Sequence, residues 1–524
     1  MAALAACSPS SGGAGASDPP GDWLVYGDTV EPSTLNCARA TDRAAWQVCR
    51  LVCDSLVDFD ASLSFVPRLA ESFSFSGDGL TLTLRLREGV TWHDGRPFTA
   101  RDVLYTVELL RALDGGRRHQ HNFGPLASVA APDDRTVVAS YREPFSGALT
   151  GWRETLILPA HIPVDPAASV SPLDRAPVGT GPFRFLRWDP QQQVVLEANE
   201  SYFGGPPGVR RYVHRIVPSL DTLRAAAQAG EVDVAPLGTD WLRANPPPHD
   251  GLPFRVVAAP TRYVQLVYWN LDEPRRLFAD PRVRRSMTML LDREGYASRV
   301  HAGSYRTALA LTDPWGGRAG ARPLPFDPSE ASRLLDEADL VDRDGDGVRD
   351  TPSGPFAFTL LYTSGANPDF REIASLFERQ AAAAGVKVAL QGLDWPMMKP
   401  RVQARDFEAA VYQWGLEPLP DPYPYLHSSQ IGPGFNFGAY RSGEVDRICE
   451  ETRRTHDRLR VKALLAELQG ILDRDQPHTI VAVPGTVTAV ARRFRTPDLT
   501  EAGLWNWYPG LLAWRVPASE RKHR

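Results

Sequence analysis

The sequence has few lysines and no long apolar runs, and both absences narrow the class of protein. No stretch of about 18 uninterrupted apolar residues occurs, so no membrane-spanning helix is predicted. Lysine is found only at Lys387, Lys399, Lys462 and Lys522. The chain carries 58 Lys and Arg residues against 63 Asp and Glu residues, which gives a formal net charge of −5. Because a nucleic-acid-binding protein needs a strongly basic surface, nucleic acid is not a predicted partner.

The usual catalytic signatures are also missing. The sequence contains no GxSxG nucleophile elbow, no HExxH zinc motif and no Gly-Lys pair of a phosphate-binding P-loop. Gly179-Thr180-Gly181 lacks the third glycine that a dinucleotide-binding fingerprint requires. These absences argue against an enzymatic function, and no cofactor is predicted.

The composition and length are typical of a globular protein with several domains. Apolar residues make up 43% and charged residues 23% of the 524 residues, which excludes long disordered regions. At about 150 residues per domain, the length predicts three or four domain-sized units. Alternating strand patterns and amphipathic helix patterns follow one another, which predicts mixed α/β sheets.

The first residues indicate an anchor. Leu4-Ala5-Ala6-Cys7 resembles the lipobox of bacterial lipoproteins, in which the cysteine is lipidated. The charged and apolar regions of a signal peptide are missing, so we expect either an earlier true start or a trimmed chain. Residues 8–22 are rich in Ser, Gly and Pro and would form a flexible tether. We therefore predict a lipid on Cys7 and a tether over 1–21, with a chance LAAC sequence as the alternative.

Four further cysteines predict structural pairing. Outside the cytoplasm, Cys37, Cys49, Cys53 and Cys449 allow two disulfides in three connectivities. Cys49 and Cys53 lie four residues apart, on one face of a predicted helix. Because no CxxC motif or clustered histidine accompanies them, a zinc site is the weaker interpretation.

Periodicity predicts many of the elements. Leu80, Leu82, Leu84 and Leu86 alternate with polar residues, which indicates a half-buried strand. Thr99 as N-cap with Asp102 in the first turn predicts the start of the following helix. Further helices are predicted over 40–58, 220–229, 281–291, 329–338, 369–384 and, as a pair, 445–473. Further strands are predicted over 23–30, 194–196, 256–258, 264–269, 356–361, 386–390, 409–414, 479–483 and 486–491.

One string carries a family resemblance. Residues 86–105 read LREGVTWHDGRPFTARDVLY. This string closely resembles the signature of the family 5 extracellular solute-binding proteins, the peptide- and nickel-binding components of ABC importers. Matching motifs follow in order as PRLAES, GTGPF, NESY, GEVD and DPRVRR, which occupy 67–72, 179–183, 199–202, 230–233 and 280–285.

The resemblance implies an architecture. We expect a periplasmic-binding-protein-like fold of class II type, with two α/β lobes, mixed β-sheets and an extra third domain. Lobe I is expected from 22–60, 176–262 and 480–517, the extra domain from 61–175, and lobe III from 263–479. The tail over 518–524 is expected to be disordered.

The resemblance also implies a function. The protein would be a monomer that captures an oligopeptide or dipeptide between its lobes. It would deliver the peptide to ABC permease and ATPase subunits at the outer face of the cytoplasmic membrane. The alternatives are a non-peptide solute such as a nickel chelate, a sugar or an opine, a receptor that reports peptide signals, and a secreted hydrolase on an unrelated fold.

The resemblance suggests ligand-binding residues, each with a structural alternative. Peptide binders carry an acid after a tryptophan, so Glu417 after Trp414 would bind the ammonium group of a peptide, unless it is a solvated loop acid. Asp421 is the other nearby carboxylate, in a segment that is a structural turn in the family. Arg371 would bind the carboxylate of a peptide, unless it is an exposed helix arginine. The aromatic residues Trp414, Tyr412 and Trp395 would line the cleft, unless they belong to the core.

An acidic loop stands apart from these residues. Asp342, Asp344 and Asp346, with Gly347, copy the start of an EF-hand calcium loop. The twelfth position is Ser353 in place of the usual glutamate. We therefore treat the loop as an Asp/Gly turn and as a weak calcium candidate.

Overall fold

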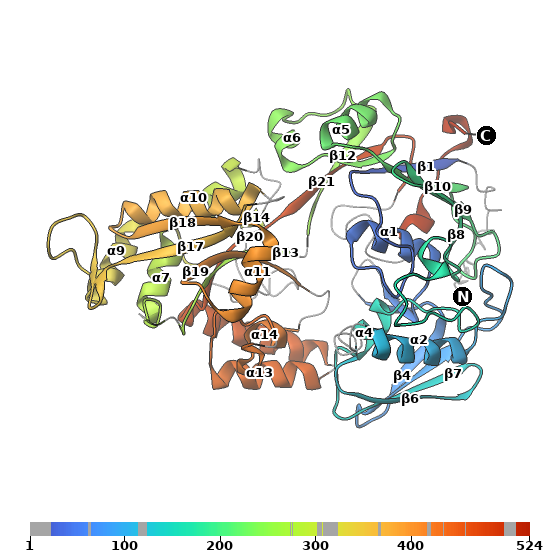
Figure 1. Cartoon of the computed structure of the whole chain (residues 1–524), viewed down its shortest axis with the longest axis horizontal. Helices are drawn as coiled ribbons and strands as arrows, with labels where there is room; N and C mark the ends of the chain where they lie inside the picture. Colours follow the sequence, from blue (N-terminus) through green and yellow to red (C-terminus); the bar gives the residue numbers. More distant parts are fainter. Residues whose placement is uncertain are drawn as a thin grey trace, which may run out of the picture.

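The chain folds into two α/β lobes and a smaller third domain (Figure 1). The computed structural model describes residues 22–60, 64–113, 123–261, 263–272, 274, 276–300, 306–307, 323–364, 368–416, 421–432, 434–455, 457–496 and 510–523. Within these ranges, no helix combines the length and the apolar character needed to cross a membrane.

Lobe I is built on a seven-stranded sheet in the order β12-β21-β11-β1-β10-β9-β8. Strand β1 pairs in parallel with β10 and with β11, and the outer pairs are antiparallel. The strands are β1 (Trp23–Asp28), β8 (Phe183–Asp189), β9 (Gln193–Ala198), β10 (Arg211–Ile216), β11 (Val234–Pro236), β12 (Phe254–Pro260) and β21 (Gly485–Ala491). The helices are α1 (Arg43–Val52), α5 (Leu220–Ala229) and α6 (Thr239–Ala244).

The extra domain is a four-stranded antiparallel sheet in the order β4-β5-β7-β6, and its described residues include the helices α2 and α4. Leu82, Leu84 and Leu86 are buried as their alternation predicts. The predicted capping box is confirmed, because the Asp102 carboxylate accepts from the Thr99 backbone N–H. The elements are β4 (Ala70–Phe75), β5 (Thr81–Leu86), β6 (Leu126–Asp133), β7 (Thr136–Tyr141), α2 (Ala100–Ala112) and α4 (Ala148–Glu154), and the short pair β2 (Val57–Phe59) and β3 (Phe65–Pro67) leads into them.

The signature string joins the extra domain to lobe I. The Nε2–H of His93 donates to the Gly181 carbonyl at 2.9 Å, and Nδ1 accepts from the Gly179 N–H at 3.3 Å. Burial lowers the pKa of His93 to about 4, so the ring stays neutral in this position. A Cβ on Gly179 would lie 1.8 Å from the Val52 carbonyl oxygen, which only glycine avoids. The signature is therefore a structural anchor between two domains.

Lobe III is built on a six-stranded sheet in the order β14-β20-β13-β19-β17-β18. The strands are β13 (Tyr263–Trp269), β14 (Arg306–Thr307), β17 (Ala357–Thr363), β18 (Lys387–Leu393), β19 (Ala409–Gly415) and β20 (His478–Val483). One face packs on α7 (Pro281–Met289), α9 (Pro328–Glu337) and α10 (Pro368–Ala382). The other face packs on α11 (Trp395–Ala404), α13 (Gly443–Arg454) and α14 (Arg458–Asp475).

The structure corrects two expected boundaries. Strand β20 pairs with β13, so it belongs to lobe III, and the chain returns to lobe I after Val483 rather than before residue 480. The tail, expected to be disordered, is held against lobe I. The Lys522 and His523 N–H groups donate to the Asp22 carboxylate at 2.8 and 3.0 Å, and the His523 ring stacks on Trp23.

Of the pairings that four cysteines allow, the described residues show one. Cys37 pairs with Cys53, whereas Cys49 and Cys449 are buried and form no disulfide among the residues that the structure describes. The physical reason is their placement, because Cys49 lies on α1 of lobe I and Cys449 on α13 of lobe III. A bridge between them would tie the two lobes together.

Candidate functional site

The candidate site lies between the edges of the two sheets where parallel strands end. In lobe III, β17 runs parallel to β18 and to β19. In lobe I, the parallel strands are β1, β10 and β11. Ligands of open α/β sheets bind in the crevice outside the carboxyl ends of such strands. Figure 1 shows α11, which follows β18, on the side of its lobe that faces α1 of the other lobe.

One pair of side chains connects these two edges electrostatically. Glu372 lies near the start of α10, after β17, and Arg243 lies on α6, after β11. Burial raises the pKa of Glu372, and the Arg243 guanidinium opposes this rise as the second cause.

Two neighbouring connections join the lobes. One runs from β12 to β13 through residues 261–262, and the other runs from β20 to β21 through Pro484. The backbone N–H and the hydroxyl of Thr261 both donate to the Pro484 carbonyl, at 2.9 and 2.8 Å. Two short connections held side by side can act as a hinge, since only a few backbone torsions must change when the lobes move.

Aromatic side chains extend from the interior of lobe III to its surface. Trp395 is 44% exposed at the start of α11, and its ring lies 5.7 Å from that of Tyr412. Tyr412 in turn contacts Phe437, which contacts Phe435, a residue that is 42% exposed. Burial raises the pKa of Tyr412 to about 12, so its hydroxyl stays protonated. Trp395 and Phe435 can bind apolar groups of a ligand.

Trp414 lies in the interior of lobe III, behind these aromatic side chains. Its side chain is only 1% exposed, and its indole N–H donates to the Tyr268 hydroxyl. The ring packs on Tyr425 and His478, at centroid distances of 4.8 and 4.9 Å. In this structure Trp414 is thus a core residue of lobe III.

The predicted charged residues differ in their surroundings. Arg371 is exposed in the first turn of α10, at the candidate edge. Asp421 is bound by the Arg453 guanidinium at 2.7 Å. Glu417 and Cys7 lie outside the described residues. The structure therefore places Arg371, Trp395 and Tyr412 on elements that begin or end at one edge, and it gives Asp421 a cation within the protein.

The acidic loop lies away from this edge. Asp342 accepts from the Gly345 and Gly347 N–H groups, which makes the loop a tight turn. The carboxylates that approach within 4.8 Å of one another are those of Asp342, Asp344 and Asp350. Asp346, which the calcium pattern includes, does not belong to this group. The loop that holds them follows α9, at the end of lobe III that points away from lobe I (Figure 1).

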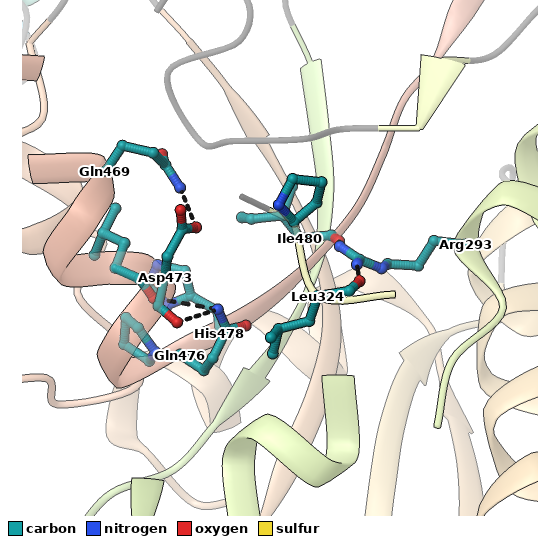
Figure 2. Close-up of a pocket in the computed structure, with 10 residues that line it drawn as sticks. Arg293, Leu324, Gln469, Asp473, Gln476, His478 and Ile480 are labelled. Carbon is teal, nitrogen blue, oxygen red and sulfur yellow. Dashed lines mark hydrogen bonds between the residues drawn. The ribbon is translucent and has the colours of Figure 1, made fainter. Parts of the chain in front are cut away.

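A small cavity inside lobe III is not the candidate site. It has a volume of about 30 Å³ and lies where α14 meets β20, with Arg293, Leu324, Gln469 and His478 in its lining (Figure 2). Burial lowers the pKa of His478 to about 3 and that of Arg293 to about 10. Ligand pockets usually measure about 300–1,000 Å³, so this cavity cannot hold a peptide.

Sequence reasoning missed several residues near the site. No sequence motif includes Arg243, Glu372 or Arg453, because the residues that they interact with lie far away in the chain. Phe435 is the exception, since an aromatic residue between glycines in the segment 434–438 could have indicated an exposed ring.

Comparisons with known proteins agree with this architecture. The model of the bacterial extracellular solute-binding proteins, family 5, middle region, matches residues 64–436, more than half of the chain. The oligopeptide-binding protein AppA of Bacillus subtilis is 29% identical over 485 residues, which covers 90% of this chain and 88% of that protein.

Solved structures show the same fold. The structure of B. subtilis AppA in complex with a nonapeptide matches with a TM-score of 0.75 and 26% identity, covering 95% of this chain and 100% of that one. The structure of NikA from Brucella suis in complex with Fe(III)-EDTA matches with a TM-score of 0.82 and 20% identity, with coverages of 95% and 100%.

Proposed function

Because the chain belongs to the family 5 bacterial extracellular solute-binding proteins, we propose that it captures a dipeptide or oligopeptide between its lobes and delivers it to an ABC permease. Proteins of this family are substrate-binding components of ABC importers that act outside the cytoplasm, and they are not enzymes. The observation that carries the proposal is the pair of opposed carboxyl edges joined by a two-segment hinge. A peptide specificity is supported by the similarity to B. subtilis AppA.

The two-lobed architecture explains how capture would work. A ligand that contacts both edges gains contacts in the closed state that the open state lacks. Only this difference in affinity can shift the population towards closure. Closure then brings new surfaces of both lobes together for recognition by the permease. An affinity near micromolar would correspond to about −8 kcal/mol.

The ends of a peptide require opposite charges. Glu417 would bind the ammonium group, and Arg371 would bind the carboxylate, since charge-assisted hydrogen bonds are the strongest available at such positions. Trp395 and Phe435 would pack against apolar side chains of the peptide. Water-filled space around these contacts would allow many peptide sequences.

We further propose that a lipid on Cys7 anchors the protein to the outer face of the cytoplasmic membrane. The tether over 1–21 would then let the folded part, a monomer, reach the permease. Mass spectrometry of the membrane fraction should show an acylated N-terminal peptide. A soluble protein with an unmodified Cys7 would contradict the anchor and leave peptide capture standing.

A thermal-shift screen tests the function. The panel contains synthetic peptides of two to nine residues, each also as its N-acetylated and its C-amidated form, together with Ni(II)–histidine, sugars and opines. We expect free peptides to raise the melting temperature and mass spectrometry to recover them intact. If only a non-peptide solute stabilises the protein, that solute and not a peptide is the ligand. If a peptide is recovered in cleaved form, the proposal is overturned.

A further inference from the structure

The extra domain contacts lobe III through Ser146, and the ring centre of the neighbouring Phe145 lies 6.0 Å from the guanidinium carbon of Arg453. Ser146 precedes α4 in the extra domain, and its backbone N–H donates to the Arg453 carbonyl at 2.7 Å. Its hydroxyl donates to the Thr452 carbonyl at 3.1 Å. Both carbonyls belong to the last turn of α13 in lobe III, which lies 306 residues further along the chain. We call Ser146, Thr452 and Arg453 the closure latch.

The acceptors of the closure latch are carbonyls that the helix itself leaves unused. The last four C=O groups of an α-helix have no partner within the helix, and the helix dipole makes this end negative. α13 ends at Arg454, and its C-cap residue Thr455 has an extended conformation. Ser146 thus supplies two donors to the end of a helix in another domain.

The side chain of Arg453 leads from the closure latch to two residues of lobe III, Asp421 and Tyr423. Its guanidinium binds both carboxylate oxygens of Asp421 and lies 3.9 Å from the ring centre of Tyr423. Asp421 directly follows the segment that contains Glu417, the proposed receptor of the peptide ammonium group. Arg453 therefore connects the extra domain to Asp421 and Tyr423 of lobe III.

The closure latch and the hinge lie on opposite sides of the gap between the lobes. Figure 1 shows β12 and β21 on the upper side, and α4 facing the ends of α13 and α14 on the lower side. Rotation about a hinge moves the points farthest from it by the largest distance. Opening of the lobes would therefore break the contacts of Ser146 before it disturbed the strands near Thr261.

We propose that the extra domain stabilises the closed state through the closure latch, and that Arg453 is a positioning residue that couples the latch to Asp421. This inference rests on the proposed function. The latch contacts no ligand, so it changes the balance between closed and open states by the same amount for every ligand. Loss of the latch should lower the affinity for every peptide by the same factor. The change should lie mainly in the dissociation rates.

Hydrogen exchange tests the latch without any ligand. The amide proton of residue 146 should be protected in the unmodified protein and should exchange about three- to tenfold faster in Ser146→Ala, which loses one hydrogen bond. In Ser146→Glu, a carboxylate would face the negative end of α13, and exchange should be at least about tenfold faster. Ser128→Ala is the matched control, since Ser128 is an exposed serine of the same domain. It should leave exchange at residue 146 unchanged.

Binding kinetics complete the test. The probes are the three peptides that give the largest thermal shifts in the panel. We expect Ser146→Ala to raise the dissociation rate of all three by the same factor, about three- to tenfold, with association rates within twofold of the unmodified protein. Arg453→Gln should also speed exchange at residue 146, because Asp421 would no longer hold the side chain of residue 453 in position.

The outcomes separate the two proposals. If no peptide binds but exchange at residue 146 responds to Ser146→Glu, the latch stands and the proposed function falls. If peptides bind, and Ser146→Glu leaves both exchange and dissociation within twofold of the unmodified protein, the latch is overturned. Factors that differ by more than threefold between the peptides would show that residue 146 contacts the ligand, which also overturns it.

Discussion

The Asp421 carboxylate accepts three hydrogen bonds from the Arg453 guanidinium: Nε donates to Oδ1 at 3.0 Å and to Oδ2 at 3.1 Å, and Nη2 donates to Oδ2 at 2.7 Å. Both side chains are less than 30% exposed. This pairing gives Asp421 a structural partner and leaves Glu417 as the acid that we propose for the ligand.

The Asp421–Arg453 pair should contribute to stability. Asp421→Asn removes one charge and leaves the guanidinium poorly paired, so the free energy of unfolding should fall by about 1–2 kcal/mol. Urea denaturation measures this change. Asp250→Asn, at an exposed position, is the control and should stay within about 0.5 kcal/mol. An equal change in both variants would show that the pair is not stabilising.

Glu417 should recognise the peptide ammonium group. Glu417→Gln keeps the size of the side chain and removes its charge, so free-amine peptides should bind about tenfold more weakly. The affinity for N-acetylated peptides should change much less, since they carry no ammonium charge. Calorimetric titration of both peptide forms measures the difference. Equal weakening of the two forms would remove this assignment.

Trp395 should select apolar peptide side chains. Its ring is 44% exposed and packs on Tyr412, so Trp395→Ala removes a large contact surface at the candidate edge. We expect peptides with aromatic residues to bind about tenfold more weakly and glycine-rich peptides to be nearly unaffected. Leu459→Ala, on the 80% exposed leucine of α14, is the control. Unchanged affinity for aromatic peptides would place their binding elsewhere.

His93 should make stability depend on pH. Its pKa is lowered to about 4 by burial, from an ordinary value of 6.5, so the folded state favours the neutral ring. Between these values the unfolded chain binds the proton more readily, and stability therefore falls on acidification. From pH 7 to pH 5 this loss should be about 2 kcal/mol smaller in His93→Gln than in the unmodified protein. Urea titrations at both pH values measure it, and equal losses would contradict the prediction.

The Cys37–Cys53 disulfide should stabilise lobe I. It closes a loop between residues 16 positions apart, so the double replacement of both cysteines by serine should cost about 3 kcal/mol of unfolding free energy. Cys49 and Cys449 should react with a thiol reagent only after unfolding, because both are buried. Protection of either thiol in the unfolded, unreduced protein would reveal a second disulfide.

Local patterns predicted the elements well. The alternating leucines of β5 and the capping box of α2 depend on neighbours only a few residues away, and both are confirmed. Cys449 shows the limit, because its helix was predicted correctly while its separation from Cys49 depends on the packing of two lobes. The lobe of β20 was missed for a similar reason, since strand pairing is set by partners about 200 residues away.

The sequence by itself determined the family and the secondary structure, because ordered motifs and hydrophobic periods are properties of short segments. Only the tertiary structure decided which residues meet at the carboxyl edges, that Arg453 binds Asp421, and that Ser146 reaches the end of α13. Those contacts join residues that are 32 and 306 positions apart. Their geometry follows from how whole sheets and helices pack, which no local pattern contains.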